Sequence, residues 1–299
     1  MNATKKAFNV NIVVLIMFLV LSALSLLPKS LLSDYKILRN YILIFINVLI
    51  YVIPIIILKK MSATKHKKFL SRKPLRLRMM PVTIAAALAA SLGGMFFNFI
   101  LIEITGYKNL PEILNPISNI MSEDMLTTFL LVIFLPSVLE ELFFRGAYLN
   151  SFIGHTKINI IVCAVLFAVM HANIYNFFGP LLAGFVYCFL VKIFDSVYPA
   201  IVAHIINNTF SLLLLYYLPN IKAAGLDTFI VVVFIILFFL LCYLTIIFSE
   251  PYLNKIKDPE KLNISERVEK QNKSSHPVNV PFYIICGLYA VKVAVDFII

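Results

Sequence analysis

Long apolar runs separated by short polar segments follow one another along the whole chain. Each run is about as long as the stretch of roughly 20 apolar residues that crosses a bilayer as a helix. The runs do not alternate apolar and polar residues as the strands of a membrane barrel do, so each one predicts a helix. We therefore predict an all-α, polytopic membrane helix bundle of about eight or nine transmembrane helices, forming a single membrane domain over residues 1–299. The expected spans cover about 10–27, 41–58, 81–104, a fourth from about 126, 158–172, 177–194, 197–218, 228–248 and 280–299.

Composition supports a membrane protein. Hydrophobic residues make up 61% of the chain, charged residues 14%, and the mean hydropathy is +0.92. Soluble domains are about 45–50% apolar and about 25% charged. The net charge of +11 would suggest a nucleic-acid partner in a soluble protein, but here the basic residues gather in loops, where they report orientation and contact with anionic lipid. The four cysteines lie in apolar runs without paired spacing, which argues against disulfides and a CxxC metal site.

The basic loops predict the orientation of the chain. The segment 59–78 is the most basic of all and should stay in the cytoplasm by the positive-inside rule, which puts the N-terminus there too. The first run follows Lys5 and Lys6 and resembles a signal peptide, but its length and the spans after it favour a retained helix. By the same count, the polar segment 249–279 is a flexible cytoplasmic loop. We predict a multi-pass protein of the cell membrane.

The fourth run carries ionisable residues where a lipid-facing helix would have none. Glu140, Glu141 and Arg145 follow the uncharged stretch 126–139, and such groups in a membrane span usually mark a functional site. Glu141 and Arg145 are spaced four apart, with the acid first, which favours an ion pair on a helix. Glu140 is rotated by about 100°, so the same arginine cannot easily pair with both acids. Pro136, four residues before Glu140, should bend or open the helix.

Three more polar residues occur in later spans. His171 ends the fifth span, and His204 and Asn208 lie four apart on one face of the seventh. A single histidine or asparagine in a membrane helix is more often structural. Two carboxylates, an arginine, two histidines and an amide together supply a base, an orienting group and oxyanion donors, which is the equipment of a hydrolase.

At these residues the chain resembles the CPBP family of intramembrane proteases. That family includes the type II CAAX prenyl endopeptidases and the bacterial Abi and bacteriocin-immunity proteins. Its three motifs occur in order within residues 126–218, the expected catalytic core, as Glu-Glu-x-x-x-Arg, Phe-x-x-x-His and His-x-x-x-Asn. They comprise Glu140, Glu141, Arg145, Phe167, His171, His204 and Asn208.

The resemblance implies an endopeptidase embedded in the membrane. In the family's usual account, one glutamate and one histidine activate water, a histidine and an asparagine stabilise the oxyanion, and a second glutamate pairs with the arginine. These roles map, in order, to Glu140 and His171, to His204 and Asn208, and to Glu141 with Arg145.

The identity of the cofactor stays open at this point. Glu140 or Glu141 with His171 and His204 would also suit zinc, which takes one carboxylate and two histidines and leaves a position for water. We favour a metal-independent mechanism in which no cofactor is required. Two further alternatives are a non-catalytic bacteriocin-immunity or regulatory protein, and a proton-coupled transporter.

The expected partners are the lipid bilayer and a membrane peptide or protein as substrate, with no nucleic acid. Loops rich in Lys, Asn and Ile are typical of bacterial coding, and bacteria generally lack protein prenylation. A bacteriocin or pheromone precursor therefore suits the sequence better than a prenylated CAAX protein.

Overall fold

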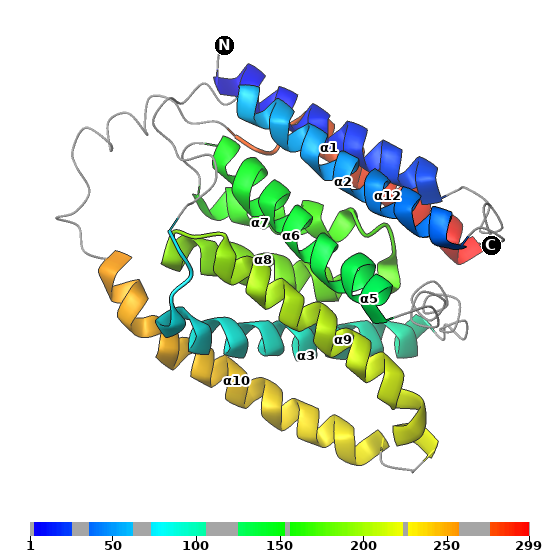
Figure 1. Cartoon of the computed structure of the whole chain (residues 1–299), viewed down its shortest axis with the longest axis vertical. Coiled ribbons are helices and arrows are strands. Elements are labelled where there is room, and N and C mark those ends of the chain that lie inside the picture. The colour runs from blue at the N-terminus through cyan, green and yellow to red at the C-terminus, as the bar shows by residue number, and fades with distance from the viewer. Residues whose placement is uncertain are drawn as a thin grey trace.

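The computed structural model consists of packed helices (Figure 1). Within the residues that it describes, helices are the only extended regular elements, which confirms the predicted all-α membrane bundle. Six of these helices are long and apolar enough to cross a membrane, and two shorter apolar helices lie at 157–169 and 198–214. The described residues are 3–25, 36–61, 73–105, 125–152, 156–223, 227–256 and 276–298.

Every expected span corresponds to a helix, because an apolar backbone in lipid must satisfy its own hydrogen bonds. Eight of the spans are the α-helices α1 (Ala3–Ser25), α2 (Lys36–Met61), α3 (Met80–Thr105), α7 (Thr156–Val169), α8 (Phe178–Phe194), α9 (Tyr198–Ala223), α10 (Asp227–Ile256) and α12 (Val280–Ile298). The fourth span is a continuous helical run built from α5 (Met125–Thr128), η2 (Phe129–Phe134), α6 (Leu135–Glu141), η3 (Leu142–Tyr148) and η4 (Leu149–Ser151). We call this run the motif helix.

Two boundaries differ from the sequence prediction. The expected loop at 249–279 begins later, because α10 continues through its first residues to Ile256; most of the remainder lies outside the described residues. The fifth span ends at Val169 rather than at Ala172, which leaves His171 in a turn. The basic-loop orientation also predicts an external loop at 105–124, and this segment lies almost wholly outside the described residues.

The helices form a layered arrangement (Figure 1). Helix α1 packs on α2 and α12 along one side of the molecule, and α2 also contacts α6 and η3 of the motif helix. Helices α7, α8 and α9 lie in the middle, while α3 packs on α8 and α9, and α10 packs mainly on α3 with a smaller contact to α8. The motif helix therefore has neighbours on both sides, and its segment from Phe143 to Leu149 is wholly buried.

Small residues allow the central helices to approach closely, as they generally do in membrane helices. A side chain on Gly94 of α3 would come within 2.5 Å of the Gly179 backbone of α8. A side chain on Gly184 of α8 would come within 2.9 Å of Ala164 on α7. Substitution at either glycine would force these helices apart.

The last helix carries an ion pair, and the cysteines are unpaired as the sequence predicted. Lys292 and Asp296 form a local ion pair of 2.7 Å near the end of α12, with both side chains partly exposed. All four cysteines are free thiols, and Cys163 and Cys188 are buried between helices.

Candidate active site

The motif helix changes its winding around the acidic pair. The segments η2 and η3 are π-helical, and the α-helical α6, which contains Pro136, Glu140 and Glu141, lies between them. Proline has no N–H to donate to the carbonyl four residues before it, which here is Val132. The helix is opened next to Pro136 as predicted, and π-helical turns of this kind are frequent at functional sites.

Glu141 is the centre of a buried charge cluster. Its Oε1 accepts a hydrogen bond of 2.8 Å from the Arg145 guanidinium and lies 3.0 Å from Nδ1 of His204. Both Glu141 and Arg145 have fully buried side chains. The ion pair predicted from the four-residue spacing is therefore present. Since the carboxylate only accepts, Nδ1 of His204 carries the proton.

Aromatic rings and a backbone carbonyl complete the surroundings of Arg145. The guanidinium carbon lies 4.3 Å from the centre of the Phe167 ring and 5.1 Å from that of Tyr187, a cation–π geometry. Its NH2 donates to the Gly184 carbonyl at 3.2 Å, which the close approach of α8 makes possible. The Tyr187 ring also stacks on His204, with centroids 5.2 Å apart. These contacts fix the guanidinium in a site closed to solvent.

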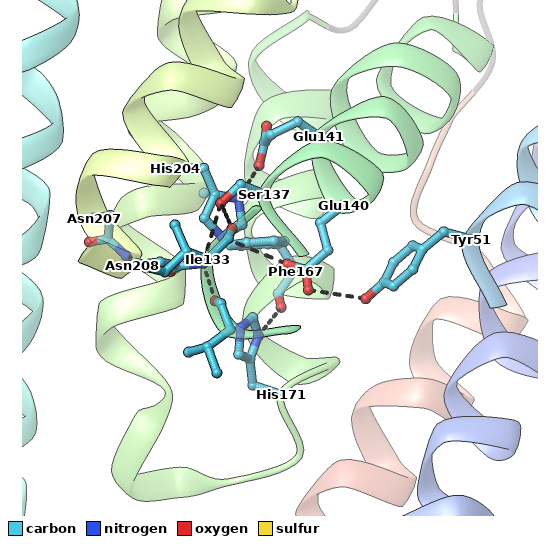
Figure 2. Close-up of polar contacts among 12 residues, drawn as sticks. Tyr51, Ile133, Ser137, Glu140, Glu141, Phe167, His171, His204, Asn207 and Asn208 are labelled. Carbon is cyan, nitrogen blue, oxygen red and sulfur yellow. Dashed lines mark hydrogen bonds and ion pairs between the residues drawn. The ribbon is translucent and has the colours of Figure 1, made fainter. Parts of the chain in front are cut away.

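Glu140 points away from this cluster (Figure 2). Its Oε1 accepts a hydrogen bond of 3.2 Å from the Tyr51 hydroxyl of α2. Its Oε2 lies 4.0 Å from Nε2 of His204, too far for a direct hydrogen bond. This Oε2 is buried and has no hydrogen-bond partner among the described residues. Both acids thus keep an Oε2 without a partner among the described residues, but the Oε1 of Glu141 has two donors, one of them Arg145, and that of Glu140 has only a neutral phenol. Arg145 pairs with Glu141 and not with Glu140, as the helical geometry predicted.

His171 reaches the same region from the turn after α7 (Figure 2). Its Nδ1 lies 2.9 Å from the Phe167 carbonyl, which can only accept, so Nδ1 carries the proton and Nε2 keeps its lone pair. Ala172 follows with a φ of 51°, a left-handed conformation that is uncommon for alanine and reverses the chain here. Glu140 lies within electrostatic reach of the His171 ring.

Asn208 is engaged by the motif helix. Its amide nitrogen donates to the Val132 carbonyl at 3.2 Å, the acceptor that Pro136 cannot satisfy, and lies 3.4 Å from the Ser137 hydroxyl. Its carbonyl oxygen lies 3.5 Å from the amide nitrogen of Asn207, whose own oxygen accepts from the Ser91 hydroxyl of α3 at 2.6 Å. This chain of bonds fixes which way the Asn208 amide points.

The depth of these residues in the bundle differs from the sequence prediction. The expected span boundaries put the acidic pair toward the cytoplasmic end of the fourth span. They put His171 at the far end of a span that begins in the cytoplasm, about 20 Å away on a straight-helix count. Instead, the motif helix continues past Glu141 to Ser151, which is about 15 Å of further helix. Glu140 therefore lies near mid-helix, at a depth that a residue just beyond the C-terminus of the short α7 can reach.

Sequence reasoning missed three contributors to the site. Tyr51 and Ser91 carry hydroxyl groups in spans outside the motifs, and Asn207 stands beside a motif residue. A lone hydroxyl in an apolar span is the available signal, but only the packing of α2 and α3 shows which hydroxyl meets a motif residue.

The polar groups do not form a ready metal site. Among the described residues, no group of three or more His, Cys, Asp or Glu side chains is arranged to hold a metal ion. The physical reason is visible at Glu141, whose Oε1 is already shared by Arg145 and His204. A zinc set that includes Glu141 would have to compete with these two donors, whereas the set of Glu140 with His171 and His204 stays a prediction.

Comparison with known proteins agrees with the motif assignment. Residues 122–210 match a family model described as type II CAAX prenyl endopeptidase Rce1-like, which confirms the resemblance to the CPBP proteases. The match covers the motif helix, α7, α8 and the first half of α9. No curated protein and no solved structure matches the chain. The family supports a membrane-embedded protease in general terms.

Proposed function

We propose that the protein is an intramembrane endopeptidase. The premise is that its motif-bearing segment matches the family of Rce1-like type II CAAX prenyl endopeptidases. The protein hydrolyses a peptide bond of a membrane-associated peptide or protein. The supporting observation is that Glu140 accepts only from a neutral phenol, whereas Glu141 is held at its Oε1 by Arg145 and His204. A general base needs a lone pair that can accept a proton; Oε2 of both acids is without a partner among the described residues, but only Glu140 is not neutralised by Arg145.

In this proposal Glu140 and His171 activate the attacking water. Glu140 Oε2 takes one proton of the water while the Nε2 lone pair of His171 accepts a hydrogen bond from the other. The polarised water oxygen attacks the carbonyl carbon of the scissile bond.

His204 and Asn208 stabilise the oxyanion that forms. Two carboxylates and one guanidinium leave one excess negative charge in a buried site, and a proton on Nε2 of His204 neutralises it. The resulting imidazolium donates from Nε2 to the oxyanion. Asn208 donates its second N–H, which it withdraws from the 3.4 Å contact with Ser137.

Collapse of the intermediate completes the reaction. The proton held by Glu140 passes to the leaving nitrogen, the carbon–nitrogen bond breaks, and a carboxylic acid and an amine are released. Glu141 and Arg145 take no proton. They keep the charge on His204 stabilised and its ring oriented. Side chains of this chain account for every step, so we propose that no cofactor is required.

We propose a membrane-associated peptide, such as a bacteriocin or pheromone precursor, as the substrate. The test is comparative peptidomics of membranes and medium from cells that express wild-type protein, Glu140→Gln or Lys292→Ala. Peptides that disappear with Glu140→Gln but persist with Lys292→Ala identify the product. Identical peptide pools in all three would favour a non-catalytic immunity or regulatory protein. Proton uptake by wild-type proteoliposomes without cleavage would favour a transporter.

Metal independence has its own test. Purified protein that turns over the identified peptide should keep its rate after dialysis against a chelator. Loss of activity that zinc restores would overturn the metal-free mechanism.

We also propose that the N-terminus is cytoplasmic. Single cysteines at Ser62 and Ser274, which lie outside the described residues, are introduced into a variant without native cysteines. Both should resist an impermeant thiol reagent in intact cells, because both follow from the same basic-loop orientation. Ready labelling of either cysteine would contradict the proposed topology.

A further inference from the structure

Helix α2 brings a tyrosine hydroxyl to Glu140. Tyr51 lies near the middle of this helix, is only 6% exposed, and donates to Glu140 Oε1 at 3.2 Å. The edge of its ring packs on Phe143, with centroids 6.2 Å apart, which fixes the direction of the phenol. Both the helix and the residue lie outside the segment 122–210 that matches the protease family.

The hydroxyl distinguishes the two oxygens of the Glu140 carboxylate. Oε1 accepts from Tyr51, whereas Oε2 has no hydrogen-bond partner among the described residues and faces His204. A carboxylate without the phenol is free to rotate about its last side-chain bond and to exchange its oxygens. With the phenol in place, the free lone pairs stay on the side of the histidines (Figure 2).

We propose that Tyr51 is a positioning residue for Glu140, and that α2 thereby completes the active site. This inference rests on the proposed protease function. Tyr51 does not touch the reacting atoms. Its hydroxyl holds Glu140 in the orientation in which Oε2 faces the attacking water and His171. A buried phenol also needs a hydrogen-bond partner for its own sake, so the test must separate positioning from stability.

Tyr51→Phe removes the hydroxyl and keeps the ring. With the peptide identified by peptidomics, we expect kcat to fall by about tenfold to hundredfold, the range that misplacement of a catalytic group produces. KM should change by less than about twofold, because the substrate itself is not contacted. A merely structural tyrosine would not produce this split.

Tyr148→Phe is the matched control. Tyr148 is also fully buried and also donates its hydroxyl to a side chain, Oδ1 of Asn11, at 2.9 Å, but it does not contact Glu140. This variant should lower Tm and leave kcat unchanged. If Tyr51→Phe behaves in the same way as Tyr148→Phe, the positioning role is wrong.

A double-mutant cycle on Tm tests the contact without any turnover. In the purified protein, Tyr51→Phe should lower Tm in the wild-type background and have no further effect in Glu140→Ala, because the partner is already gone. Additive shifts would overturn the contact. Failure of the proposed function is seen separately, as identical peptide pools from wild-type and Glu140→Ala cells, and the positioning role would then fall with it.

Discussion

The neighbouring glutamates of the motif helix lie on two faces that differ in burial and in hydrogen-bond partners. Toward α8 and α9, Glu141 is fully buried and shares one oxygen between Arg145 and His204. Toward α2, Glu140 is 14% exposed at its side chain and accepts a single bond from Tyr51. We call these the closed face and the open face. A carboxylate paired with a buried guanidinium stabilises its surroundings, whereas one that accepts only from a neutral phenol is able to move a proton.

Glu140→Gln on the open face should have the largest effect on turnover. The amide keeps the shape and still accepts from Tyr51, but it has no basic lone pair. We expect kcat to fall by about 10²–10⁴ or more, with Tm nearly unchanged. Glu103→Gln, an exposed position on α3, is the control and should keep full activity. Full activity in Glu140→Gln would end the assignment of Glu140 as the base.

Glu141→Gln on the closed face should damage both fold and activity. It leaves the guanidinium of Arg145 buried without a counter-charge, which costs about 3–5 kcal/mol of unfolding free energy. Thermal unfolding of the purified protein measures the loss. Lys292→Ala is the matched control, because it breaks an ion pair of the same spacing that is partly exposed, and it should cost at most about 1 kcal/mol. Equal losses in the two variants would contradict the distinction between the faces.

Asn208→Ala tests the proposed role of the Asn208 amide as a hydrogen-bond donor to the oxyanion. Loss of one oxyanion donor should lower kcat by about a hundredfold. A small loss of Tm should accompany it, because the Val132 carbonyl also loses its donor. Asn47→Ala, which removes an amide that bonds only within α2, should leave kcat unchanged. An unchanged kcat in Asn208→Ala would mean that the residue only joins two helices.

Ser91→Ala should have the smallest effect of the series. Without the serine hydroxyl, the Asn207 amide is free to turn over and no longer fixes the orientation of Asn208. We expect kcat to fall by about fivefold, equivalent to one ordinary hydrogen bond. Thr83→Val removes a buried hydroxyl from the same helix that bonds only to Met79, and it should leave kcat intact. If Thr83→Val lowers kcat as much as Ser91→Ala does, the loss comes from disturbed packing of α3 and not from the contact with Asn207.

Sequence patterns predicted where the helices lie along the chain better than they predicted which helices pack against one another. Helices α3 and α10 were both expected from uniform apolar runs, yet half of the span in α3 is buried and none of that in α10 is. Lipid and the protein interior are equally apolar, so hydropathy cannot tell a helix that is buried in the protein from one that faces lipid. The small residues of α3, such as Gly94 against Gly179, are the signal that separates them, and α10 has none of comparable effect.

The sequence by itself determined the membrane bundle, the Glu141–Arg145 pair and the separation of Glu140 from that arginine. These follow from local physics: apolar length, a four-residue spacing and a rotation of about 100° per residue act within one helix. Only the tertiary structure decided that His204 meets Glu141, that Asn208 bonds the carbonyl freed by Pro136, and that Tyr51 reaches Glu140. Those contacts join residues far apart in the chain, and they depend on which faces α2, α3 and α9 turn toward the motif helix.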